Sequence, residues 1–226
     1  MATDTSSGVS SRRIAIVAVW CAAFLVALAV DRPVATWIHD NGIDVALKSP
    51  AWRWFSKIGH VPGVGRLPGN FLTFPLIAAI WFFCLGRRWW PAAGLVFLAG
   101  LFAGANVLVK WIVGRARPFQ GEMFGIHPFV GGIHGLGGAN QSFPSGDVCL
   151  GAATAFSLMI ILPRWSAVWI GLVVMVAAER ILENAHFPSD TVAAVGLGWL
   201  LARLAWRLLG KPRAPNDVRD SVPADI

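Results

Sequence analysis

The chain has 226 residues, of which 56% are hydrophobic and only 14% are charged, and its formal net charge is +7. So few charged side chains argue against a soluble domain and favour a membrane protein. The basic residues are scattered among hydrophobic segments without any RNA- or DNA-binding signature, so we expect no nucleic-acid partner. The three cysteines, an odd number, all lie in apolar runs and predict no disulfide framework.

Six apolar runs, taken in chain order, predict six helices that span the lipid bilayer. Each crossing of a roughly 30 Å hydrocarbon core takes about 20 residues. The runs cover residues 14–30, 71–85, 90–113, 146–162, 165–178 and 191–209. For the first run, a cleaved signal peptide with Ala27-Leu28-Ala29 as its cleavage region is an alternative, although the run is longer than most such regions.

The segment between the first two runs, residues 49–60, predicts a helix that lies in the membrane interface. Ser49 is a suitable N-cap, Pro50 suits the first helical position, and aromatic and basic side chains follow. The expected fold class is therefore an all-α membrane protein, a six-transmembrane-helix bundle with an interfacial helix between the first and second spans. Residues 1–13 and 211–226 are expected to be flexible cytoplasmic ends.

Basic residues near the ends of the runs predict the orientation. The positive-inside rule places both termini in the cytoplasm. The residues that then lie on the cytoplasmic side are Arg12, Arg13, Arg87, Arg88, Arg164, Arg203, Arg207, Lys211 and Arg213. The loops that follow the third and fifth runs lie on the opposite face.

Three polar segments fall on that opposite face and are expected to meet where the helices bundle. They read KWIVGRARP at 110–118, FPSGD at 143–147 and ERILENAHFPSD at 179–190. Considered one at a time, the lysine and arginine side chains of these segments could simply extend to the lipid headgroups, and Asp190 could simply cap a helix. Taken together, they predict a phosphate site.

Phosphate binding needs fixed cations and free backbone N–H groups. The cations of the expected site are Lys110, Arg117 and Arg180. A helix that starts at Gly146 supplies the N–H groups, and its glycine allows close approach. His186 is the candidate nucleophile, and Asp190, four residues later, is within reach to hold its tautomer.

These segments resemble the three signatures of the type 2 phosphatidic acid phosphatases, also called lipid phosphate phosphatases and related to the vanadium haloperoxidases. The signatures are Lys-x6-Arg-Pro, Pro-Ser-Gly-His and Ser-Arg-x5-His-x3-Asp. The first is intact from Lys110 to Pro118. The third has Glu179 in place of serine, and the second has Asp147 in place of histidine.

The resemblance implies that residues 14–210 form a six-helix membrane phosphatase domain in a bacterial-type inner membrane, with an active site that opens to the periplasm. It implies a phosphohistidine on His186, oriented by Asp190. The residues implied to hold the phosphoryl oxygens are Lys110, Arg117, Ser145, Gly146 and Arg180. The substrate would be a phosphate monoester or diphosphate of a membrane lipid: undecaprenyl diphosphate, lipid A, phosphatidylglycerol phosphate or phosphatidate. No metal or other cofactor is expected, since no cluster has metal-ligand spacing and the basic site neutralises phosphate.

Asp147 leaves three interpretations open, because the histidine expected there protonates the leaving oxygen and a carboxylate beside cations is a poor acid at neutral pH. A diphosphate leaving group needs little protonation. Alternatively, His127, His134 or Glu122 from the loop 119–143 replaces the acid. The remaining interpretation is a protein that binds or translocates lipid phosphate without turnover. Phosphate transfer to an acceptor lipid is a further alternative to hydrolysis.

Overall fold

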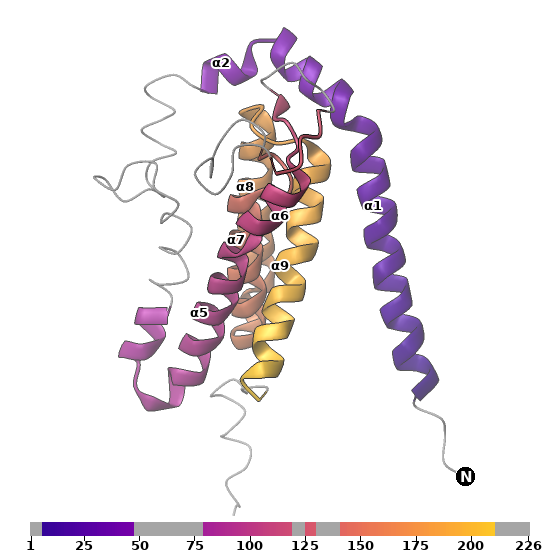
Figure 1. The fold of residues 1–226 in the computed structure, drawn as a ribbon. Coiled ribbons are helices and arrows are strands. Elements are labelled where there is room, and N and C mark those ends of the chain that lie inside the picture. Colours follow the sequence, from indigo (N-terminus) through magenta and orange to yellow (C-terminus); the bar gives the residue numbers. More distant parts are fainter. Residues whose placement is uncertain (1–5, 48–78, 119–124, 130–140, 211–226) are drawn as a thin grey trace, which may run out of the picture.

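The computed structural model describes residues 6–47, 79–118, 125–129 and 141–210. Within these ranges the chain is helical, with no strand and a single isolated bridge between Arg115 and Ile126. The long helices stand side by side as a bundle (Figure 1). The predicted all-α class is confirmed.

The helices of the described ranges follow the predicted apolar runs. They are α1 (Ser6–Asp40), α2 (Ile43–Leu47), α5 (Trp90–Gly104), α6 (Asn106–Val113), α7 (Gly146–Ile161), α8 (Ser166–Leu182) and α9 (Pro188–Leu208), with short 3-10 turns η2 (Arg87–Trp89) and η5 (Pro163–Trp165). Residues 79–84 are also helical. Two helices differ from expectation: α1 continues ten residues past the predicted end, and the third run is divided at Ala105.

Four stretches of the described residues are long and apolar enough to cross a membrane: Ile14–Asp40, Arg87–Val113, Pro163–Leu182 and Pro188–Leu208. They coincide with the first, third, fifth and sixth predicted spans. The fourth predicted span corresponds to the shorter apolar helix α7. The second span lies mainly, and the interfacial helix 49–60 wholly, outside the described residues, so the count of six stays a prediction.

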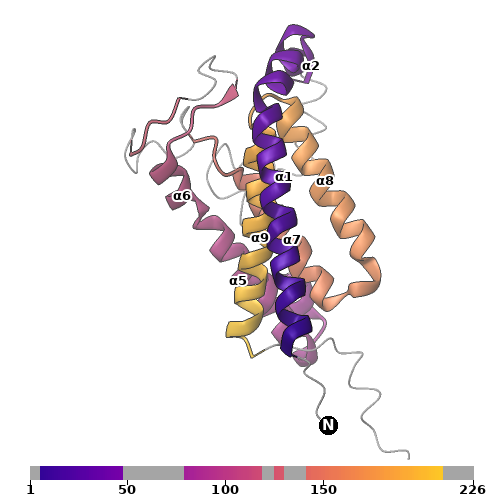
Figure 2. The ribbon, with the colours of Figure 1, turned by 90° about the vertical axis from the view of Figure 1, so that its right-hand side faces the viewer.

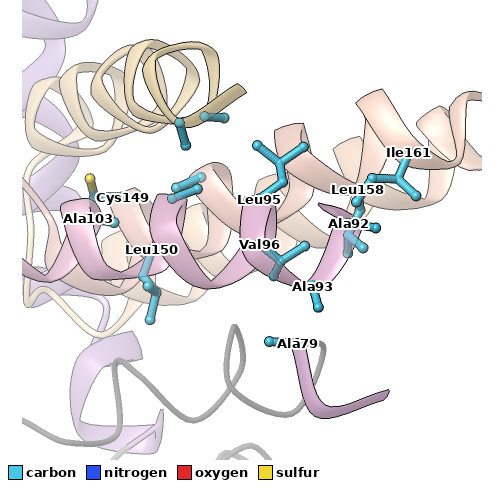
Figure 3. Close-up of a cluster of buried hydrophobic side chains, with 14 of the residues drawn as sticks. Ala79, Ala92, Ala93, Leu95, Val96, Ala103, Cys149, Leu150, Leu158 and Ile161 are labelled. Carbon is cyan, nitrogen blue, oxygen red and sulfur yellow. The ribbon is translucent and has the colours of Figure 1, made fainter. Parts of the chain in front are cut away.

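Helix α7 is the centre of the bundle and packs against α5, α8 and α9. Apolar residues are buried on several sides of α7, as expected for a helix without a polar face. Figure 3 shows the cluster in which Leu95 and Val96 of α5 lie with Leu150 and Leu158 of α7. This packing fixes the height of the first turn of α7 in the bundle.

Glycine and alanine let α9 approach α7 closely. A Cβ atom on Gly198 would stand 2.7 Å from the Cβ of Ala152 and 2.7 Å from the carbonyl oxygen of Cys149, too near for any side chain without movement. Ala194 and Ala202, one turn away on each side, are fully buried. Small residues at such spacing are what close helix packing in a membrane requires.

The outward faces of α1 and α8 are apolar and exposed. Val17 and Leu25 of α1 and Val174 and Met175 of α8 are at least 60% exposed. Exposed apolar faces on helices of this length fit a lipid surrounding. Both ends of the described chain, at Ser6 and Gly210, lie at the lower end of the bundle in Figure 1, whereas α7 and α9 begin at the upper end.

Candidate active site

The three predicted polar segments meet at the upper end of the bundle. There α6 ends, α7 begins, α8 ends and α9 begins (Figure 2). The charge of Lys110 acts on His186, Asp147 and Asp190, and the charge of Arg117 acts on Lys110 and His186. Residues from segments far apart in the sequence therefore share one electrostatic site.

The turn between α8 and α9 carries His186. Asn184 adopts a left-handed backbone conformation, with φ of 54°, which asparagine tolerates better than most residues. The N–H groups of Ala185 and His186 both donate to the carbonyl oxygen of Arg180, at 3.2 Å each. This tight turn directs the imidazole into the bundle, where His186 is 4% exposed.

The hydrogen bond of Nδ1 determines the tautomer of His186. Nδ1 lies 2.8 Å from the carbonyl oxygen of Ser142, and a carbonyl only accepts, so Nδ1 carries the proton. Nε2 then keeps its lone pair. The nearest oxygen of Asp190 is 3.8 Å from Nδ1, longer than a hydrogen bond, so the backbone of Ser142, and not Asp190 as predicted, is the direct partner of this proton.

Burial also keeps the imidazole neutral. It lowers the pKa of His186 from 6.5 to about 4, because a charged ring loses its hydration there. The nearby carboxylate of Asp190 opposes this shift, whereas the positive charges of Lys110 and Arg117 add to it. At neutral pH the ring is therefore uncharged and available as a nucleophile.

Asp190 is fixed on both of its carboxylate oxygens and is fully buried. Oδ1 accepts from Nη1 of Arg115 at 2.6 Å. Oδ2 accepts from the hydroxyl of Ser142 at 2.5 Å and from the backbone N–H of Phe187 at 2.9 Å. Asp190 thus caps α9 and holds Ser142, whose carbonyl in turn receives the His186 proton.

A buried network behind Asp190 connects this carboxylate to α1. Arg115 donates from Nη2 to Asp31 at 2.8 Å and from Nη1 to the hydroxyl of Ser189 at 2.7 Å. Asp31 also accepts from the backbone N–H of Ser189 at 2.9 Å. The guanidinium carbon lies 4.1 Å from the centre of the Phe187 ring. Every charge in this network has an opposite charge and further hydrogen bonds, as buried ions require.

The first turn of α7 adds hydrogen-bond donors to the site. The hydroxyl of Ser145 is buried and has no hydrogen-bond partner among the described residues. Its backbone N–H donates to the carbonyl oxygen of Asp190 at 3.2 Å, which joins the start of α7 to α9. The N–H groups of Gly146 and Asp147 have no acceptor within the helix, as in any first turn. These donors suit an anion.

Lys110 and Arg180 approach from the other two segments. Lys110, in the last turn of α6, is buried and donates from Nζ to the carbonyl oxygen of Gln141 at 3.0 Å. Arg180, in the last turns of α8, contacts the carboxylates of Asp147 at 3.2 Å, Glu179 at 3.2 Å and Glu183 at 3.0 Å. Its Nε is buried without an acceptor among the described residues.

The profile of the PAP2 superfamily matches residues 88–214, more than half of the chain and all of the cluster except Asp31. The chain belongs to the PAP2 superfamily. Two curated relatives are each named lipid A 1-phosphatase. One, from Rhizobium etli, is 32% identical over 106 residues, which are 46% of this chain and 42% of the relative. The other, from Rhizobium johnstonii, is 34% identical over 114 residues, 48% of this chain and 44% of the relative.

The match thus covers less than half the length of each relative. No solved structure gives a significant match to the chain.

One of the three candidate auxiliary residues of this PAP2 chain lies in the described ranges. His127 belongs to the segment 125–129, which runs alongside residues 114–116: its N–H donates to the carbonyl oxygen of Gly114 at 2.8 Å, and the N–H of Ala116 donates to Gly125 at 2.8 Å. Glu122 and His134 lie outside the described residues. A part for any of the three in catalysis stays a prediction.

Sequence reasoning missed the residues that support the imidazole from behind. They are Asp31, Arg115, Ser142 and Ser189. Two signals pointed toward them: an acid directly after the first apolar run, and a second arginine inside the segment 110–118. Neither signal names its partner, because the contact between Asp31 and Arg115 joins residues 84 positions apart.

Proposed function

We propose that the chain is an integral membrane phosphatase that removes a phosphate group from a lipid through a phosphohistidine on His186. One observation carries this proposal: Nδ1 of His186 donates to the Ser142 carbonyl, so Nε2 keeps its lone pair in a neutral ring. The positive charges of Lys110 and Arg117 act on that ring, and the Ser145 hydroxyl at the start of α7 has no hydrogen-bond partner among the described residues. A nucleophile next to anion-binding donors suits phosphoryl transfer.

In the first step, Nε2 of His186 bonds to phosphorus, and the bond from phosphorus to the lipid oxygen breaks. The ring then carries positive charge, which Asp190 stabilises across 3.8 Å and the Ser142 carbonyl stabilises through the Nδ1 proton. In the second step, water bonds to phosphorus, the N–P bond breaks and phosphate leaves. Lys110, Arg117, Arg180, Ser145 and the N–H of Gly146 hold the phosphoryl oxygens in both steps. The cations supply the charge that a metal ion supplies in other phosphatases, so we propose a metal-independent reaction.

The substrate that fits best is a lipid A 1-phosphate, which the name of both relatives indicates. We treat it as a lipid with a phosphate on the anomeric oxygen of a sugar. An anomeric oxygen leaves as a more stable anion than an ordinary alkoxide, so it needs less help from an acid. Asp147, which contacts Arg180 at 3.2 Å, replaces the signature histidine that would donate this proton, so a leaving group that needs little protonation suits this site. The same reasoning keeps undecaprenyl diphosphate as a substrate, and ranks phosphatidate and phosphatidylglycerol phosphate lower.

We further propose that the protein is a multi-pass protein of a bacterial inner membrane, with cytoplasmic ends and a site on the periplasmic face. Arg87, Arg88, Arg164 and Arg207 support this orientation, since they belong to η2, η5 and the end of α9, away from His186. Basic residues at one end of a helix bundle mark the cytoplasmic side.

Phosphate release by the purified full chain tests the activity. The panel contains a lipid A 1-phosphate, undecaprenyl diphosphate and phosphatidate, each with wild type and His186→Ala. We expect release from the sugar phosphate to exceed release from phosphatidate, and His186→Ala to abolish both. Acid-labile label on the wild type alone, after rapid quenching with a 32P substrate, identifies the phosphohistidine.

Equal release by wild type and His186→Ala rules out the enzyme and leaves a lipid-phosphate-binding or translocating protein. Phosphate that appears on a second lipid instead of in water identifies a phosphotransferase.

A further inference from the structure

Three carboxylates surround the guanidinium of Arg180. Asp147 approaches Nη1 from the first turn of α7, and Glu179 and Glu183 approach Nη2 from α8 itself. We call these three residues the carboxylate clamp. The side chain of Arg180 is 17% exposed, and those of Asp147, Glu179 and Glu183 are 41%, 25% and 19% exposed.

The clamp reverses the local charge at Arg180. One guanidinium opposite three carboxylates gives a net charge of −2, and the two remaining cations of the site, Lys110 and Arg117, bring the sum only to zero. Each carboxylate also takes a donor that a phosphate oxygen would otherwise use. A guanidinium has five N–H donors, and the clamp contacts both of its terminal nitrogens.

The Nε of Arg180 is a donor that the clamp does not contact. It is buried and has no acceptor among the described residues. Three of the five N–H donors face a carboxylate, so a phosphate that reaches this guanidinium finds Nε and one N–H of Nη1 ready, and gains the others only by displacing a carboxylate. An anion that is held only by Arg180 competes poorly with the three carboxylates. A ligand that other contacts also hold in the site competes better.

We propose that the carboxylate clamp sets the specificity of the phosphate site by competing with phosphate for Arg180, so that free inorganic phosphate binds weakly and a phosphate anchored on a lipid binds well. The proposal rests on the function proposed above. The lipid ester keeps its place through its membrane anchor while Lys110, Arg117 and the start of α7 engage its oxygens. The released phosphate has no anchor, so it leaves the site.

Equilibrium binding of inorganic phosphate to the detergent-purified full chain tests the clamp. Measurements use a His186→Ala background, in which turnover does not interfere. We expect Glu179→Gln, Glu183→Gln and Asp147→Asn each to tighten phosphate binding by about 2- to 5-fold at low salt, the upper part of the range for partly exposed ion pairs. The gain shrinks at high salt because these charges are screened.

Two comparisons make the result specific to Arg180. Asp40→Asn removes the same charge from an exposed residue at the end of α1, and we expect phosphate affinity to change less than twofold. Repeating the clamp substitutions in an Arg180→Ala background removes the competition, so the gain disappears. The proposal is overturned if the clamp variants bind phosphate no more tightly than Asp40→Asn does. It is also overturned if the gain in phosphate affinity persists in the Arg180→Ala background.

Substitution by amides keeps the shape of each side chain, and size-exclusion elution verifies the fold. Where Glu179→Gln yields no monodisperse protein, Glu179→Ser takes its place. The clamp proposal and the proposed function can be refuted separately. Tighter phosphate binding in variants of a chain whose wild type releases no phosphate from lipids refutes the proposed function alone, and an active wild type whose clamp variants bind phosphate unchanged refutes the clamp alone.

Discussion

Arg115 and Asp190 form a buried ion pair of 2.6 Å directly behind the candidate nucleophile. The same guanidinium binds Asp31 at 2.8 Å, so one cation joins the first helix to the start of the last one. Asp190 then holds the Ser142 hydroxyl, and the Ser142 carbonyl accepts the imidazole proton. The position of the His186 ring thus depends on α1 through four consecutive polar contacts.

Asp31→Asn is expected to weaken both the fold and the catalytic geometry. The substitution leaves Arg115 with one buried counter-charge in place of two, and breaking a buried pair costs about 3 kcal/mol. We expect a lower unfolding temperature in detergent and a fall in kcat larger than the change in KM, since Asp31 lies behind the substrate site. Asp40→Asn serves as the control, because Asp40 is exposed at the end of the same helix. Equal unfolding temperatures for the two variants would show that the network contributes nothing to stability.

His186 is expected to titrate near pH 4 and not near 6.5. Because its pKa is lower in the folded state, the unfolded chain takes up the proton first as the pH falls below 6.5. Stability is therefore complete above pH 6.5 and declines toward pH 4, by about 3 kcal/mol for this group. NMR titration of histidine-labelled protein measures the pKa, and the signal missing from His186→Asn assigns it. The same variant should lose part of the acid sensitivity; an unchanged pH profile of unfolding would contradict the shift.

Gly198→Ala is expected to destabilise the bundle, whereas Gly151→Ala is not. A methyl group at 198 meets Ala152 and the Cys149 carbonyl at 2.7 Å, and overpacking of this kind costs about 1–3 kcal/mol. A methyl group at 151 meets nothing within 4 Å, and alanine suits a helix interior better than glycine. Thermal unfolding of both variants in detergent measures the difference. Similar melting curves would mean that α7 and α9 are further apart at Gly198 than the 2.7 Å distances from its Cβ position imply.

Gly114→Ala is expected to detach the segment 125–129 from the end of α6. Gly114 has φ of 61°, and a Cβ there would lie 1.9 Å from the carbonyl oxygen of His127. Gly86→Ala is the matched control, since Gly86 also has a positive φ but nothing lies within 4 Å of its Cβ position. We expect faster limited proteolysis near residue 125 and reduced phosphate binding for Gly114→Ala only. Identical cleavage of the two variants would refute the close approach.

Periodicity and charge predicted the elements of this fold better than their contacts. The apolar runs located α1, α7, α8 and α9, because a spanning helix must be apolar over its whole length. The division at Ala105 was not predicted, since no proline interrupts the run there. The order and direction of the predicted spans placed Lys110 and His186 at the same end of the bundle.

The partners of the site residues could not be predicted, because they depend on three-dimensional packing. The acceptor of the His186 proton is a backbone carbonyl, which any residue type supplies, so no side chain in the sequence marks it. Asp147 and Glu179 were visible as departures from the signatures. The contact of Asp147 with Arg180, however, follows only from the way α7 packs on α8.

Asp147→His is expected to change substrate preference more than total activity. A histidine in the first turn of α7 supplies a proton donor near neutral pH, which helps an alkyl leaving group by about 10²-fold and an anomeric or diphosphate leaving group far less. The ratio of kcat/KM for phosphatidate to that for a lipid A 1-phosphate should therefore rise. Asp147→Asn is the control, because it also removes the contact with Arg180 but supplies no acid, so its ratio should not rise. Equal ratios in the two variants would mean that position 147 does not reach the leaving oxygen.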